Sequence, residues 1–236
     1  MFLLRLSGHS CAGKTRLVNA LPLFGINCPK VLRYTSRAPR PEEIEGGDYF
    51  FRSREIIAAL PEEKYLVGPV RNMLQAFDLD QIEAGLETHD LMLIEIYPTL
   101  WLKLVSRLEG RMPGKLVTAS VFMTAVDPAV ISSFKNDEEK AGYISSEVYK
   151  MLLFRQKDEI EDIMVRAHAA ASEILEALSP GGSKMYAKII HSAPEGPDGE
   201  DDWTREEKPV GKALEAIIQF RSLLSQLPDR IIYANS

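Results

Sequence analysis

Residues 8 to 15 read Gly-His-Ser-Cys-Ala-Gly-Lys-Thr, which fits the pattern GxxxxGK(S/T) of a phosphate-binding loop. Glycines let the backbone approach a phosphate chain closely, so that amide N–H groups point inward. We expect Lys14 to reach the β- and γ-phosphates of ATP, and the Thr15 hydroxyl to ligate Mg²⁺. The residues expected to line the ATP phosphates are Gly8, Ser10, Ala12, Gly13, Lys14, Thr15 and Arg16.

A second group of residues suited to anions lies between residues 35 and 49. Arg37 and Arg40 stand around prolines, and a guanidinium binds phosphate through paired hydrogen bonds. Tyr49 adds a phenolic donor. Two interpretations stay open. The residues form either a clamp for a second phosphate, separate from the one in the loop, or a solvent-exposed basic turn.

The elements that must position these residues follow from the hydrophobic pattern. An apolar run over residues 2–6 predicts a strand before the loop, and residues 16–20 favour a helix whose N-terminus attracts anions. Short strands at 48–51, 64–67 and 73–77 predict a small antiparallel subdomain that carries the two arginines. Further strands are expected at 30–34, 91–96, 115–123 and 187–191, and helices at 79–87, 98–109, from Asp127-Pro128 onward, and at 210–227. The alternation predicts an α/β fold with a mostly parallel sheet.

The region leading to the second half of the chain is polar. Residues 135–142 fit either a mobile lid, which would exclude water from phosphoryl transfer, or a plain surface connection. Asp158 and Glu161 then cap a long helix, which carries apolar residues at helical spacing. The expected core positions are 160, 163, 164, 167, 171, 174 and 178. Arg166 lies off this stripe and faces either phosphates or water.

Together these motifs resemble the guanylate kinase family. That family carries GPSGxGKS followed by TTRxPRxGExxGxDYxF, and this chain has TSRAPRPEEIEGGDYFF, with Arg37, Arg40, Asp48 and Tyr49 on the family positions. A lid arginine and a helix arginine eleven residues later match Arg155 and Arg166. The resemblance covers roughly residues 1 to 192.

The resemblance implies a single domain over residues 1–236 with a P-loop kinase fold, in which a central parallel sheet is flanked by helices. The core would be 1–32, 79–134 and 158–236, the acceptor-binding subdomain 33–78 and the lid region 135–157. It also implies transfer of the ATP γ-phosphate, with Mg²⁺, to a phosphorylated acceptor, GMP being the first candidate. The implied catalytic residues are Lys14, Arg155 and Arg166, and the implied acceptor-binding residues are Arg37, Arg40, Tyr49 and Glu95.

Departures from the family pattern leave the acceptor open. Val67 stands where the family has a glutamate that recognises guanine. A second acidic residue of the family, at the end of an apolar strand, is present here as Glu95. His9 and Cys11 replace the proline and glycine that the family prefers in its loop. A sugar phosphate such as ribose 1,5-bisphosphate is therefore an alternative acceptor. A non-catalytic nucleotide- or protein-binding module and an ATP-hydrolysing switch are further alternatives.

Composition sets the broad class. The chain has 236 residues, 45% hydrophobic residues and a net charge of −6, which suits a soluble domain and speaks against nucleic acid as partner. Apolar runs are too short for a membrane span. Two cysteines, Cys11 and Cys28, form no disulfide framework, so we expect a cytoplasmic protein. Four scattered histidines predict no metal site, Trp101 is expected in the core and Trp203 at the surface, and 195–207 reads as an acidic solvated loop. A homodimer is left open.

Overall fold

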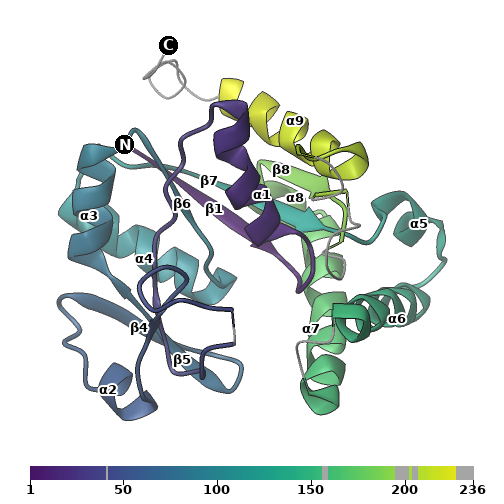
Figure 1. Cartoon of the computed structure of the whole chain (residues 1–236), viewed down its shortest axis with the longest axis horizontal. Helices are drawn as coiled ribbons and strands as arrows, with labels where there is room; N and C mark the ends of the chain where they lie inside the picture. The colour runs from purple at the N-terminus through teal and green to yellow at the C-terminus, as the bar shows by residue number, and fades with distance from the viewer. Residues whose placement is uncertain (41, 156–158, 195–201, 204–206, 227–236) are drawn as a thin grey trace. The chain divides into compact units, whose positions relative to one another are not determined.

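The computed structural model describes residues 1–40, 42–155, 159–194, 202–203 and 207–226 (Figure 1). It divides into two compact units. The first unit comprises Met1–Arg5 and Cys28–Thr118, and the second comprises Leu6–Asn27 and Ala119–Ser236. The expected cap residue Asp158 and most of the acidic segment 195–207 lie outside the described residues.

A four-stranded sheet has the strand order β6-β1-β7-β8. Its strands are β1 (Phe2–Gly8), β6 (Leu91–Ile94), β7 (Val117–Thr124) and β8 (Lys188–His191). The β1–β6 and β7–β8 pairs are both parallel. Phe2 to Leu6 are all buried, as expected for a strand of a parallel sheet covered on both faces. The predicted α/β fold with a parallel sheet is confirmed.

The first unit carries a second four-stranded sheet, in the order β3-β2-β5-β4. Its strands are β2 (Tyr34–Thr35), β3 (Phe50–Phe51), β4 (Tyr65–Val70) and β5 (Met73–Asp78). The β2–β5 and β4–β5 pairs are antiparallel, whereas the β2–β3 pair is parallel, so the sheet is mixed. The prediction of a purely antiparallel subdomain was wrong in this pair.

The expected strand at 30–34 was also wrong. Lys30 forms an isolated bridge with Leu93, while Tyr34 pairs with Ala76 in the other sheet. Because the pairing partner changes along this stretch, no single neighbour supports a continuous strand. The stretch therefore joins two sheets instead of belonging to one.

Three helices cover the first unit: α2 (Arg54–Ala58), α3 (Leu79–Thr88) and α4 (Pro98–Arg111). Asp78 begins α3 by accepting hydrogen bonds from the Asp80 and Gln81 amides, and Pro98 opens α4. Both starts were predicted. Apolar side chains of α3 and α4 pack with strands β4 to β6 into one core, which includes Leu66, Phe77, Ile82, Ile94, Trp101 and Leu104.

The helices of the second unit are α1 (Lys14–Ala20), the 3₁₀ helix η1 (Leu21–Phe24), α5 (Pro128–Ser133), α6 (Asp137–Arg155), α7 (Ile160–Leu178), α8 (Gly182–Met185) and α9 (Gly211–Ser225). Helices α6 and α7 pack side by side (Figure 1). Helix α6 begins at Asp137, so most of the polar stretch 135–142 is helical. Its movement as a lid, like the division into subdomains, stays a prediction. Among the described residues, no helix is both long and apolar enough to cross a bilayer.

The core face of α7 differs in part from the predicted stripe. Ile160 and Met164 were expected in the core but are 60% and 49% exposed. The buried face instead includes Arg166, Ala170 and Ala177, beside the correctly expected Ile163 and Ile174. The alanines of α7 lie in one buried cluster with Ile144, Val148 and Leu152 of α6.

Candidate active site

The loop at residues 8–15 joins β1 to α1 in the second unit, as a phosphate-binding loop requires. Two glycines are needed for steric reasons. A Cβ at Gly8, where φ is 138°, would lie 2.2 Å from the Met123 carbonyl oxygen. A Cβ at Gly13, where φ is 76°, would lie 2.9 Å from the Trp203 ring. The same contact explains why Trp203, expected at the surface, is only 5% exposed.

Cys11 takes a left-handed backbone with φ of 64°, a conformation that glycine adopts without strain. Its side chain is buried in the apolar core of the second unit, in the same cluster as Phe122 and Ile163. The sequence raised the concern that the Cβ of Cys11 would crowd the loop. The structure places that side chain in the core, and the loop keeps its turn at Cys11.

Lys14 folds back onto its own loop. Its Nζ donates to the carbonyl oxygens of Gly8, at 2.7 Å, and His9, at 2.8 Å. Thr15 is exposed beside it at the start of α1, and Arg16 is half-buried. These two carbonyl oxygens hold the ammonium against the loop.

Arg166 reaches the loop from α7. Its Nε donates to the Ser10 hydroxyl at 3.1 Å, and one terminal nitrogen lies 3.3 Å from an Asp162 carboxylate oxygen. Arg166 is only 8% exposed, which decides against the open alternative that it faces water. Arg155 ends α6 and is half-buried. Its catalytic role stays a prediction.

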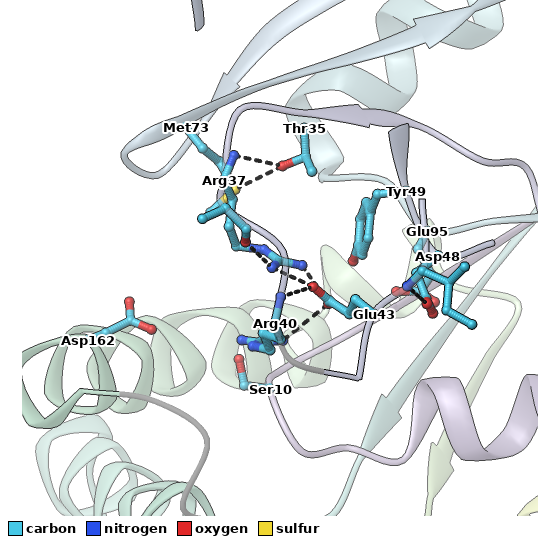
Figure 2. Close-up of polar contacts among 12 residues, drawn as sticks. Ser10, Thr35, Arg37, Arg40, Glu43, Asp48, Tyr49, Met73, Glu95 and Asp162 are labelled. Atoms are coloured by element: carbon cyan, nitrogen blue, oxygen red, sulfur yellow. Dashed lines mark hydrogen bonds and ion pairs between the residues drawn. The ribbon is translucent and has the colours of Figure 1, made fainter. Parts of the chain in front are cut away.

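The first unit holds the two predicted clamp arginines (Figure 2). Arg37 binds the Glu43 carboxylate through both terminal nitrogens, at 2.7 and 2.6 Å. The Arg40 amide donates to the same carboxylate at 2.8 Å, and the Arg40 guanidinium lies 3.8 Å away. Burial by itself raises the pKa of Glu43, but the hydrogen bonds and charges of Arg37 and Arg40 outweigh it and hold that pKa below its ordinary value. Glu43 is ionised at neutral pH.

Tyr49 stands among cations next to this clamp. The Arg33 guanidinium lies 4.8 Å from the Tyr49 ring centre and that of Arg37 lies 5.0 Å away. Arg33 also donates to the Tyr49 hydroxyl at 3.0 Å and to the Glu95 carbonyl oxygen at 2.8 Å. The Glu95 carboxylate pairs with Lys30 at 3.1 Å. Tyr49 therefore lies between two groups of side chains. One group holds Arg37 and Arg40 around Glu43, and the other holds Arg33 and Lys30 around Glu95.

Sequence reasoning missed Arg33, Lys30 and Glu43. Glu43 lies inside the matched motif, six residues after Arg37, so its position was a usable signal. Lys30 and Arg33 stand outside that motif and approach Glu95 only because the chain folds back, a contact over 62 positions for Arg33. Val67 on β4 pairs with Ala76 and supplies no carboxylate.

Mg²⁺ was expected on Thr15. The Thr15 hydroxyl is a hard oxygen donor, exposed at the start of α1, and it fits an ion that is held chiefly by nucleotide phosphates. Within the described ranges, no group of three or more His, Cys, Asp or Glu side chains could hold a metal ion by itself. The residues fit a metal that arrives with ATP.

No family model matches the chain. Sequence comparison finds a guanylate kinase from Nitrosospira multiformis, 47% identical over 62 residues, which are 26% of this chain and 30% of that protein. A guanylate kinase from Halalkalibacterium halodurans is 38% identical over 65 residues, which are 28% of this chain and 32% of that protein. Over these stretches the chain is similar to guanylate kinases.

The chain spans less than a third of the length of these guanylate kinases. Among solved structures, a guanylate kinase from Anaplasma phagocytophilum has a TM-score of 0.49 at 16% identity, covering 98% of this chain and 88% of the other. A fungal RNA kinase has a TM-score of 0.46 at 12% identity, covering 100% of this chain and 91% of the other.

Proposed function

We propose that this guanylate kinase relative is an ATP-dependent phosphotransferase that acts on a phosphorylated acceptor, with the nucleoside monophosphate GMP as the first candidate. The observation that carries the proposal is the presence of two separate sets of cationic side chains in one chain. Lys14 and Arg166 meet at the phosphate-binding loop, while Arg37 and Arg40 form a separate clamp in the first unit. An ATP-hydrolysing switch requires the first set but has no use for the second.

In the proposed reaction the γ-phosphoryl group leaves the β–γ bridging oxygen of ATP and bonds to a phosphate oxygen of the acceptor. Arg37, Arg40 and Tyr49 hold the acceptor phosphate, and Lys14, Arg155 and Arg166 offset the charge on the transferring group. The acceptor oxygen is already ionised, so no general base is needed. Thr15 would hold Mg²⁺, which when bound neutralises charge on the β- and γ-phosphates.

A sugar phosphate such as ribose 1,5-bisphosphate is the second candidate acceptor, and one observation favours it. Glu95 is the acid left to read guanine, and its carboxylate already pairs with Lys30 and lies 3.8 Å from Arg33. With Val67 in place of the other acid, the region offers cationic donors more than carboxylate acceptors. A non-catalytic module is the weakest candidate, because Lys14 and Thr15 are both present at the loop.

The test is consumption of Mg·ATP by the full chain with GMP, dGMP, AMP, UMP, CMP, ribose 1,5-bisphosphate or no acceptor. Acceptor-dependent turnover would support the proposal, and the acceptor that gives the highest kcat/KM identifies the substrate. ATP consumption that is equal with and without every acceptor would instead indicate a switch. Binding of ATP without consumption would indicate a binding module. Cytoplasmic location and dimerisation stay predictions.

A further inference from the structure

His9 lies inside the phosphate-binding loop, and its ring is buried. It follows Gly8 at the end of β1 and is only 1% exposed. Its Nε2 accepts a hydrogen bond from the Ala125 amide at 3.0 Å, just beyond the end of β7. Its Nδ1 lies 2.5 Å from the Ser10 carbonyl oxygen within the loop. The ring thus bridges the loop to the end of a sheet strand.

The hydrogen-bond partners determine which nitrogen carries the proton. The Ala125 amide can only donate, so Nε2 must be unprotonated and Nδ1 must donate to the Ser10 carbonyl. The Thr124 hydroxyl, 3.4 Å from Nε2, uses its own proton on the Val126 carbonyl at 3.0 Å. Burial lowers the pKa of His9 to about 3, with a further decrease from the Lys14 ammonium, so the ring is neutral at physiological pH.

A second anchor holds the other half of the loop. The buried Ser192 hydroxyl, just after β8, donates to the Ala12 carbonyl at 2.7 Å, and the Ser192 amide donates to the Thr124 carbonyl at 2.8 Å. The loop is therefore fixed to the ends of β7 and β8 at two points. Next to the first anchor, the Gly8 and His9 carbonyls hold the Lys14 ammonium.

We propose that His9 is a positioning residue for the ATP site, whose neutral imidazole fixes the phosphate-binding loop to the end of β7 in the conformation that receives the nucleotide. It acts through the loop backbone and Lys14 and does not itself touch the nucleotide. The inference depends on the proposed function only in taking this loop as the ATP phosphate site. A preorganised loop binds phosphates without a further ordering cost, and that advantage is lost when the Ala125 bond is removed.

Replacing His9 by glutamine or by asparagine distinguishes between the two hydrogen bonds of its ring. The side-chain oxygen of His9→Gln reaches the Nε2 position and can accept from the Ala125 amide, whereas His9→Asn reaches only the Nδ1 position. His9→Phe keeps the ring and removes both bonds. The matched control is His168→Asn, because His168 is exposed on α7 and its Nδ1 lies 2.8 Å from the Met164 carbonyl oxygen one turn away. The measurement is the Kd of Mg·ATP by calorimetry, together with the Tm of each variant.

We expect His9→Asn and His9→Phe to weaken Mg·ATP binding about tenfold or more, since a buried amide is left without an acceptor. His9→Gln should restore affinity to within about threefold, and His168→Asn should match the wild type. Equal affinity for the Gln and Asn variants would overturn the inference. So would a lowered Tm with unchanged Kd, because His9 would then serve stability alone. Failure of the wild type to bind Mg·ATP would also overturn it.

Nitrogen NMR of the wild type keeps the test decisive if the Asn and Phe variants do not fold. We expect the Nδ1-protonated tautomer of His9 throughout pH 5 to 7; an Nε2-protonated ring, or titration near the ordinary histidine pKa of about 6.5, would overturn the inference. The proposed function fails separately. If Mg·ATP binds as expected but no acceptor is phosphorylated, the positioning role of His9 stands and the transferase proposal does not.

Discussion

Lys14 in the phosphate-binding loop rests on two carbonyl oxygens, whereas Arg37 in the clamp binds a carboxylate through both terminal nitrogens. In the loop, the Gly8 and His9 carbonyls hold the Lys14 ammonium, and a neutral histidine fixes the loop to the end of β7. The clamp holds two arginines around Glu43, so part of their charge is already offset. A site can therefore be preorganised either by backbone carbonyls or by an ion pair, and we expect the two sites to respond differently to mutation.

The largest expected effect tests the loop. Lys14→Ala removes the ammonium that would meet the transferring phosphoryl group, and we expect kcat/KM to fall about 10³-fold. Lys150→Ala is the control, because Lys150 is an exposed lysine that pairs with Glu147 on α6. Steady-state kinetics with the acceptor from the panel provides the measurement. Activity of Lys14→Ala within tenfold of the wild type would contradict the assignment of the loop.

The clamp should respond on the acceptor side alone. For the double variant Arg37→Ala and Arg40→Ala, we expect kcat/KM for the acceptor to fall about 10²-fold while the Kd of Mg·ATP is unchanged. Arg52→Ala is a matched control, since Arg52 pairs with Glu45 at 2.6 Å in the same segment. An equal loss for ATP and acceptor would show that the two anion sets do not act separately.

Acid should lower the stability of the folded chain through His9. The pKa of His9 is about 3 in the folded chain and about 6.5 unfolded, so below pH 6.5 the unfolded chain binds more protons and stability falls. Between pH 7 and pH 5, we expect His9 alone to decrease the free energy of unfolding by about 2 kcal/mol. Urea unfolding of the wild type and His9→Gln at both pH values measures the difference. An equal acid effect in both proteins would contradict it.

Local chemistry made much of the fold predictable. The loop glycines, the Asp78 cap of α3 and the Asp127 cap of α5 each follow from a backbone need that one residue type meets, and all lie where the sequence predicted. The clamp motif likewise placed Arg37 and Tyr49 near each other. Such features depend on neighbours within a few residues, which a sequence displays directly.

Features that depend on distant partners could not be predicted in the same way. Trp203 is buried because it packs on Gly13, and Arg33 joins Glu95 across 62 positions. His9 is anchored by the Ala125 amide, 116 positions away, and no residue near His9 in the sequence indicates that contact. In each case a polar or aromatic side chain has several plausible surroundings, and tertiary packing selects one.

The smallest expected effect tests the ion pair that distinguishes the clamp. Glu43→Gln removes the negative charge beside Arg37 and Arg40, which favours anion binding, but it also replaces one of the two acceptor oxygens that hold the Arg37 fork by an amide donor. We expect the loss of order to prevail, because misplacing a binding group costs more than a partly exposed charge gains, and the acceptor KM should rise about tenfold with the ATP KM unchanged. Glu45→Gln removes the same charge two residues away and should leave both constants unchanged. A lower acceptor KM for Glu43→Gln would show instead that Glu43 competes with the acceptor phosphate for the two arginines. The Glu43 ion pair would then inhibit acceptor binding, whereas the contacts of the loop favour binding of ATP.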